Sequence, residues 1–256
     1  MKIKSVSVKN GMCIALAFST TLLFSCQKDK TPPQQAPAVA TEENSDLSVF
    51  KTMESEYTKL VLRPGPNDGQ DVYVDKLQGV PVGNQNHVPE LPINQWTNGG
   101  LPLNTRSFIK FEDISLVPAN ANVVSAKLIL YGMSSSLNTP QGNSTYPGSP
   151  YSYYGNNSCW VQQVVGSDWN ETTLTYDNQP ATTTTDQAEL GASTSQWNYN
   201  TAVDVTAIVK KMVANPSTNF GFGIKLQTEQ VYRSIVFASS ETTCRTQRPK
   251  LVIIYE

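Results

Sequence analysis

The longest apolar run beyond residue 26 reads Val123-Val124-Ser125-Ala126-Lys127-Leu128-Ile129-Leu130-Tyr131. A run of this length, rich in β-branched residues and bounded by Asn and Gly, is typical of a β-strand. Eight further segments have the same character and are separated by turn-forming residues. They are residues 57–62, 71–74, 106–111, 159–165, 172–176, 221–226, 233–238 and 251–255. Nine short strands at this spacing predict an all-β fold, a sandwich of two antiparallel sheets.

One segment, residues 204–215, follows a helical period instead. Its apolar residues recur at the spacing of one helix face; they are Val205, Ile208, Val209, Met212 and Val213. Asp204 or Thr206 can cap its start, and Pro216 lies just beyond its end. We therefore expect one short helix at an end of the sandwich. Residues 137–158 have no such pattern and predict a long loop, a kind of segment that is often functional.

Three quoted stretches carry a family resemblance. They are the strand 106–111 with Val117-Pro118-Ala119-Asn120-Ala121, the turn Trp169-Asn170-Glu171-Thr172-Thr173-Leu174-Thr175-Tyr176-Asp177-Asn178-Gln179-Pro180, and the C-terminal Arg248-Pro249-Lys250-Leu251-Val252-Ile253-Ile254-Tyr255. Their order resembles the DNRLRE domain, which is related to the carboxy-terminal module of archaeal disaggregatase and to an alginate-binding family of carbohydrate modules. The resemblance covers about residues 60–256 and implies a jelly-roll-type sandwich that serves as an accessory module. Two departures are Tyr176, where the family usually has Trp, and the expanded loop 137–158.

The N-terminus resembles a bacterial lipoprotein signal. Lysines precede an apolar run over residues 12–24, which is too short to span a bilayer. The run ends in Leu23-Phe24-Ser25-Cys26, similar to a lipobox, which implies diacylation of Cys26 and cleavage before it. Residues 26–55 then predict a flexible tether, because they are rich in Pro, Gln, Ala and Glu. The expected organisation is a signal peptide (1–25), a tether (26–55) and one domain (56–256), lipid-anchored in the cell envelope and most simply at the outer membrane.

Composition limits the partners. The leader holds three lysines and no acidic residue, so its removal changes the formal net charge from −2 to −5. No basic block exists, which argues against nucleic acid as a partner. Membrane contact is expected through the lipid alone.

The cysteines and acidic turns suggest two further features. Cys159 and Cys244 are equally compatible with a disulfide and with two unrelated thiols, since spacing does not give geometry. No cofactor is expected, although Asp68, Asp71 and Glu241 offer the oxygen ligands that calcium prefers. His87, the only histidine, lies in a loop without a discernible partner.

Strand alternation groups the first candidate binding residues. If Ile109 and Ile224 face the core, basic and amide side chains of the same strands face outward. This outer set consists of Arg106, Lys110, Lys225 and Gln227, with Tyr232 and Arg233 at the start of a later strand. Guanidinium groups bind carboxylates in bidentate fashion, so the set suits an anionic, uronate-containing polysaccharide. A solvated sheet face with no ligand explains the same pattern.

The second candidate set is aromatic. Tyr151, Tyr153 and Tyr154 lie in the long loop, and Trp96 precedes Asn98-Gly99-Gly100. Such rings stack on sugars or contact proteins. They equally suit a loop that is pinned by its own side chains.

Three functions are compatible with these observations. A non-catalytic polysaccharide binder fits the resemblance and the anchor. A structural or adhesin domain that contacts envelope proteins is the first alternative. A polysaccharide hydrolase or lyase is the second, although no nucleophile elbow, paired-histidine motif or phosphate loop is present, so we expect no enzyme.

Overall fold

The computed structural model describes residues 48–51 and 56–256. The predicted signal peptide, Cys26 and most of the predicted tether lie outside these residues. Within the described part of the chain, no helix is long and apolar enough to cross a membrane.

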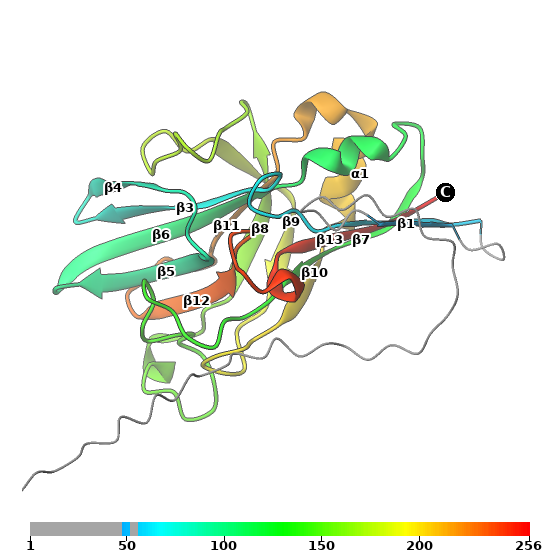
Figure 1. Cartoon of the computed structure of the whole chain (residues 1–256). Coiled ribbons are helices and arrows are strands. Elements are labelled where there is room, and N and C mark those ends of the chain that lie inside the picture. Colours follow the sequence, from blue (N-terminus) through cyan, green and yellow to red (C-terminus); the bar gives the residue numbers. More distant parts are fainter. Residues whose placement is uncertain (1–47, 52–55) are drawn as a thin grey trace, which may run out of the picture. The chain divides into compact units, whose positions relative to one another are not determined.

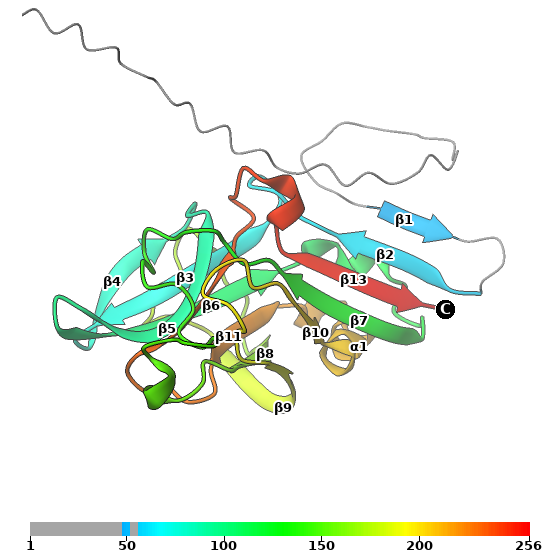
Figure 2. The same ribbon diagram turned by 90° about the horizontal axis from the view of Figure 1, so that it is seen from below.

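The described chain forms two antiparallel sheets (Figures 1 and 2). The five-stranded sheet has the order β1 (Ser48–Lys51), β2 (Thr58–Leu62), β13 (Lys250–Tyr255), β7 (Val123–Leu130), β10 (Thr201–Asp204). The eight-stranded sheet has the order β12 (Arg233–Ala238), β5 (Glu90–Asn98), β6 (Leu101–Lys110), β11 (Phe222–Leu226), β8 (Cys159–Val165), β9 (Ala181–Leu190), with β3 (Gln70–Leu77) on β6 and β4 (Val80–Gln85) on β3. The predicted all-β sandwich is confirmed.

The main core lies between the two sheets. Alternate side chains of β7, Ala126, Leu128 and Leu130, are fully buried there. They belong to one cluster with Ile109 of β6 and Phe222 of β11 in the opposite sheet. Alternation of this kind assigns the remaining side chains of β6 and β11 to the outer face.

Strand β6 organises the eight-stranded sheet. One side of β6 pairs with β3 along residues 103–110. Its other side pairs first with β5 at residues 101–105 and then with β11 at residues 107–109. The sheet therefore divides at β6, with β12 next to β5 on one branch and β8 and β9 next to β11 on the other.

The single α-helix among the described residues is α1 (Thr206–Ala214), as expected, and it packs against β7. The N-cap position is occupied by Val205, and no side chain caps the helix, so neither predicted cap is confirmed. Asp204 lies one residue earlier, and its Oδ1 accepts a hydrogen bond from Thr206 N at 3.0 Å. Thr206 instead uses Oγ1 to bind the backbone of Ala126. Short 3₁₀ turns occur at η1 (Glu112–Leu116), η2 (Ser152–Tyr154), η3 (Pro216–Thr218) and η4 (Arg245–Gln247).

Strands β4, β5, β9 and β10 were not predicted, and two further details differ from expectation. Strand β1 falls within residues 26–55, so strand pairing begins inside the segment predicted as a flexible tether. Residues 172–176 are not a strand. Asn170 Oδ1 accepts from Thr172 N, and Asn178 Oδ1 accepts from Thr175 N, so side-chain caps hold this segment in turns.

The long loop between β7 and β8 covers the free side of β12. Three alternate N–H groups of β12, those of Ser234, Val236 and Ala238, donate to this region rather than to a strand. Their acceptors are Ser144 Oγ, Asn143 Oδ1 and Tyr131 O. The loop is irregular, as predicted, but it takes the place of a neighbouring strand.

Candidate functional site

Sheet register builds the floor of a cleft on the outer face of the eight-stranded sheet. Gly223 of β11 lies opposite Phe108 of β6 and opposite Gln162 of β8. A Cβ at position 223 would approach Thr182 Cγ2 to 2.8 Å and Phe108 Cε1 to 3.2 Å. Glycine at this position therefore allows β9 and the Phe108 ring to approach the floor closely.

The segment 166–180 forms one wall, because it folds back over the outer face. Trp169 and Leu174 pack on Val72, Val74 and Phe108 in a second, smaller hydrophobic cluster. The indole Nε1 of Trp169 donates to Phe220 O at 2.8 Å. This anchoring positions the residues that follow, Tyr176 to Pro180, at the edge of the cleft.

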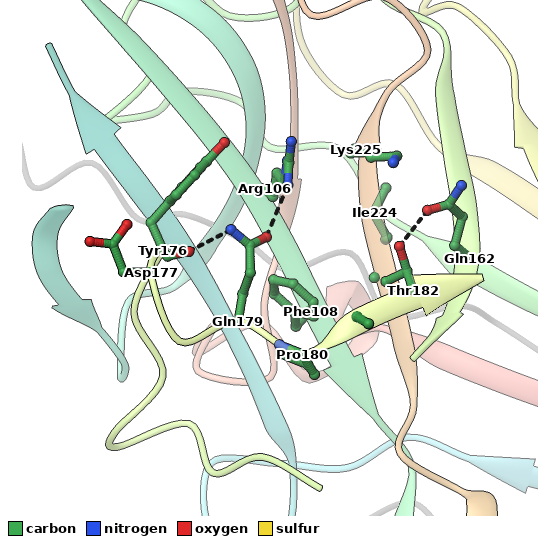
Figure 3. A pocket seen from close by; sticks show the side chains of 12 residues that line it. Arg106, Phe108, Gln162, Tyr176, Asp177, Gln179, Pro180, Thr182, Ile224 and Lys225 are labelled. Carbon is green, nitrogen blue, oxygen red and sulfur yellow. Dashed lines mark hydrogen bonds between the residues drawn. The ribbon is translucent and has the colours of Figure 1, made fainter. Parts of the chain in front are cut away.

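The cleft has a volume of about 380 Å³, within the range of small-molecule sites. Figure 3 shows Arg106 between Tyr176 and Lys225, with Gln162 and Thr182 on the far side. Its lining combines a phenol ring, amide and hydroxyl groups and two cations over an apolar floor. That combination offers a sugar ring both a flat surface and hydrogen-bond partners.

The guanidinium group of Arg106 is fixed by hydrogen bonds that use only part of its donors. Its Nε and Nη2 donate to the two carboxylate oxygens of Glu229 at 2.8 and 2.9 Å, and Nη1 donates to Gln179 Oε1 at 3.1 Å. The hydrogen bonds to Glu229 raise the pKa of Arg106. Burial would raise the pKa of Glu229, but the hydrogen bond and charge of Arg106 outweigh it and lower that pKa. The described residues accept from three of the five guanidinium N–H groups, which leaves two that can donate to a ligand.

Tyr176 lies between two cations. Arg106 Cζ and Lys76 Nζ are each 5.3 Å from the centre of its ring, and Lys76 also pairs with Asp177 at 3.0 Å. Burial raises the pKa of Tyr176, so the phenol stays neutral and can donate. The Gln179 side chain ties the two parts together, since its Nε2 donates to Tyr176 O at 2.6 Å.

Lys225 provides the free charge of the cleft. It forms no ion pair with any residue that the structure describes. Lys225, Arg106 and Lys76 contribute three positive charges at the cleft and its rim. Glu229 and Asp177 contribute two negative charges, so the net charge there is +1, although the whole chain is acidic. Two sequence-predicted residues, Arg106 and Lys225, therefore meet at one site.

The predictions for two other outer residues need correction. Lys110 does point away from the core, but it is only 7% exposed. Its Nζ binds Asp168 at 3.0 Å and Glu112 at 3.2 Å, because the loops after β8 and β6 close over it. Gln227 is half-buried and lies outside the cleft. Neither residue lines the cleft with Arg106.

The aromatic candidates come together at a second place. The Trp96 ring lies edge-on to Tyr151 at 4.7 Å and to Tyr232 at 5.2 Å, and Tyr154 contacts Tyr232 at 4.7 Å. Arg233 donates to Tyr154 O at 2.7 Å and so ties the loop to β12. The rings pin the loop, but Tyr153 remains 93% exposed. This group of five rings is called the aromatic cluster below.

The three acidic candidates have different contacts. Asp68 Oδ1 accepts from Gly65 N and so closes a turn. Asp71 and Glu241 belong instead to a region that also includes His87 and Glu171. His87 was expected to have no partner, but its Nδ1 lies 3.6 Å from Glu241 Oε1.

Of the two alternatives for Cys159 and Cys244, a disulfide between them is excluded. Cys159 is a free cysteine and is fully buried in the main core. Its side chain packs there as a small apolar group.

Several cleft residues were not found from the sequence. Gln162, Gln179 and Thr182 have no distinctive sequence pattern, and sheet register and a folded-back loop bring them to the site. Glu229 is 123 positions from the arginine that it binds. Tyr176 had one signal, its place where the resembling family usually has Trp.

The model of carbohydrate-binding module family 96 matches residues 69–255, which include every residue of the cleft and of the aromatic cluster. No curated protein matches the chain.

Proposed function

The chain belongs to carbohydrate-binding module family 96, and on that basis we propose that its outer cleft binds a polysaccharide without cleaving it. The observation that carries this proposal is the meeting of Arg106, Tyr176 and Lys225 over one apolar floor. A family of carbohydrate-binding modules indicates a non-catalytic domain, which disfavours the hydrolase or lyase alternative.

Anionic, uronate-containing chains are the ligands that we propose. Among residues 56–256, Lys225 forms no ion pair and Arg106 keeps two unused donors, so a sugar carboxylate can bind both. The net charge of +1 around the cleft supports the same choice. Each contact is partly solvated, so affinity should be micromolar to millimolar and should fall as salt rises.

The aromatic cluster supports a second candidate function. Tyr153, 93% exposed beside four packed rings, offers a flat surface for a neutral sugar or for an envelope protein. This would correspond to the adhesin alternative. It requires no charge in the ligand.

We also propose that the module acts at the cell envelope, anchored by a lipid on Cys26. The leader and lipobox sequence supports this location. A tethered binding module would hold polysaccharide close to the membrane.

Titration calorimetry of the protein against alginate and a neutral glucan tests these proposals. Lys225→Ala should weaken alginate binding up to about fivefold, as expected for one partly screened charge contact. Lys210→Ala, which removes an exposed lysine on α1, is the matched control and should change nothing. Equal affinity for both polymers, lost in Tyr153→Ala, would favour the aromatic cluster. If neither polymer binds, the adhesin alternative gains support.

A further inference from the structure

Three loops that are distant in sequence bring His87, Glu171 and Glu241 together. His87 lies between β4 and β5, Glu171 in the segment that walls the cleft, and Glu241 after β12. One ligand atom from each of the three residues lies within 4.8 Å of the other two. Of these atoms, His87 Nδ1 and Glu241 Oε1 are 3.6 Å apart.

The two glutamates are shielded from water without a cation to balance them. The Glu241 side chain is only 8% exposed, and its Oε1 is fully shielded and has no hydrogen-bond partner. Glu171 is buried, and its Oε2 accepts from Asp71 N at 3.2 Å. Neither glutamate pairs with a lysine or arginine among residues 56–256. Burying two unneutralised carboxylates side by side is unfavourable.

A third carboxylate increases the imbalance. Asp71 is 3% exposed; Ser240 N donates to its Oδ2 at 2.7 Å, while its Oδ1 has no partner. Among residues 56–256, no lysine or arginine forms an ion pair with Asp71, Glu171 or Glu241.

The histidine side of the group is open. The His87 side chain is 60% exposed, so an ion could reach the glutamates from that side. The His87 backbone has a φ of +58°, a left-handed conformation that histidine adopts more readily than most non-glycine residues.

We propose that His87, Glu171 and Glu241 bind a divalent transition-metal cation such as Zn²⁺, with Asp71 as a supporting carboxylate. Ligands about 2.1 Å from a tetrahedral zinc are roughly 3.4 Å apart, close to the 3.6 Å between His87 and Glu241. An imidazole ligand indicates zinc and not calcium, because calcium prefers oxygen ligands alone. The ion would neutralise the glutamates and link three loops, one of which carries the wall of the cleft.

The test uses the full chain, which contains a single histidine. One equivalent of Zn²⁺ should shift the imidazole proton resonances of His87 and raise the thermal unfolding midpoint. Both effects should disappear in His87→Ala, and Glu241→Gln should weaken Zn²⁺ binding at least tenfold. Glu189→Gln, an exposed glutamate on β9, is the matched control and should bind Zn²⁺ as the unaltered protein does.

A second measurement separates ligation from a folding defect. In a chelator, Glu241→Gln should melt at a higher temperature than the unaltered protein, because it removes carboxylate repulsion. A His87 resonance that does not move with Zn²⁺ would overturn the proposal. It would also fail if Ca²⁺ stabilised His87→Ala as well as the unaltered protein, since the site would then use oxygen ligands alone. No arm involves a glycan, so the outcome is independent of the proposed function.

Discussion

Arg106 and Glu229 are joined by two hydrogen bonds of 2.8 and 2.9 Å beside the cleft. The bidentate geometry fixes the guanidinium plane, while the carboxylate partly neutralises its charge. Glu229 therefore has two opposing effects on an anionic ligand: it positions Arg106, and it repels the ligand.

The first prediction separates these effects. Glu229→Gln keeps an acceptor for Arg106 but removes one negative charge. We expect alginate affinity to rise by up to about fivefold, with a steeper salt dependence, and affinity for a neutral glucan to stay constant. Calorimetry at two salt concentrations measures both. Glu56→Gln makes the same charge change on an exposed residue away from the cleft, and weaker alginate binding in Glu229→Gln would mean that positioning dominates.

The second prediction concerns the wall of the cleft. Trp169→Phe removes the donor to Phe220 O and leaves a partly buried carbonyl without this partner. The free energy of unfolding, from urea titration, should fall by about 1–3 kcal/mol. Trp197→Phe is the control, because the half-buried Trp197 indole donates no hydrogen bond within residues 56–256. An equal loss in both variants would argue against the hydrogen bond as the cause.

Cys159 gives the third prediction. Burial raises the pKa of its thiol, so at neutral pH it should be protonated and shielded. Peptide mapping after alkylation should find Cys159 unlabelled in the native protein and labelled in denaturant without reductant. Labelling in denaturant only after reduction would contradict a free thiol.

The fourth prediction tests the anchor. Cys26→Ser should release the protein from the membrane fraction, since the thiol is the expected acylation point and the leader is too short to span a bilayer. Cell fractionation followed by detection of the protein measures this. A variant that stays in the membrane fraction would count against the lipobox.

The sequence predicted the elements that have a strong period. The buried run 123–131 became β7, and residues 204–215 contain α1. The strands that were missed lack such a period. β9 (Ala181–Leu190) contains four consecutive threonines, and β5 contains Pro92, which usually argues against a strand. The pairing of β5 with β6 begins at Asn94. Proline lacks a backbone N–H, but Pro92 lies before this pairing, so no hydrogen bond to β6 is lost.

Alternation placed Arg106 and Lys225 on one face correctly, because both strands bury their other face in the main core. It could not tell that Lys110 would be enclosed, since Asp168 and Glu112 reach it from loops. The meeting of His87 with Glu171 and Glu241 was beyond a sequence argument for the same reason. It depends on how three loops fold, and loops lack the periodic hydrophobic pattern from which helices and strands are predicted.

The covered edge of β12 affects how copies of the protein can associate at high local concentration. A bare strand edge is a template on which a second molecule can add its own strand. Here the N–H groups of β12 are already bonded to Asn143, Ser144 and Tyr131. When copies are packed densely along one polymer or one membrane, strand addition at this edge would therefore first require the loop to detach.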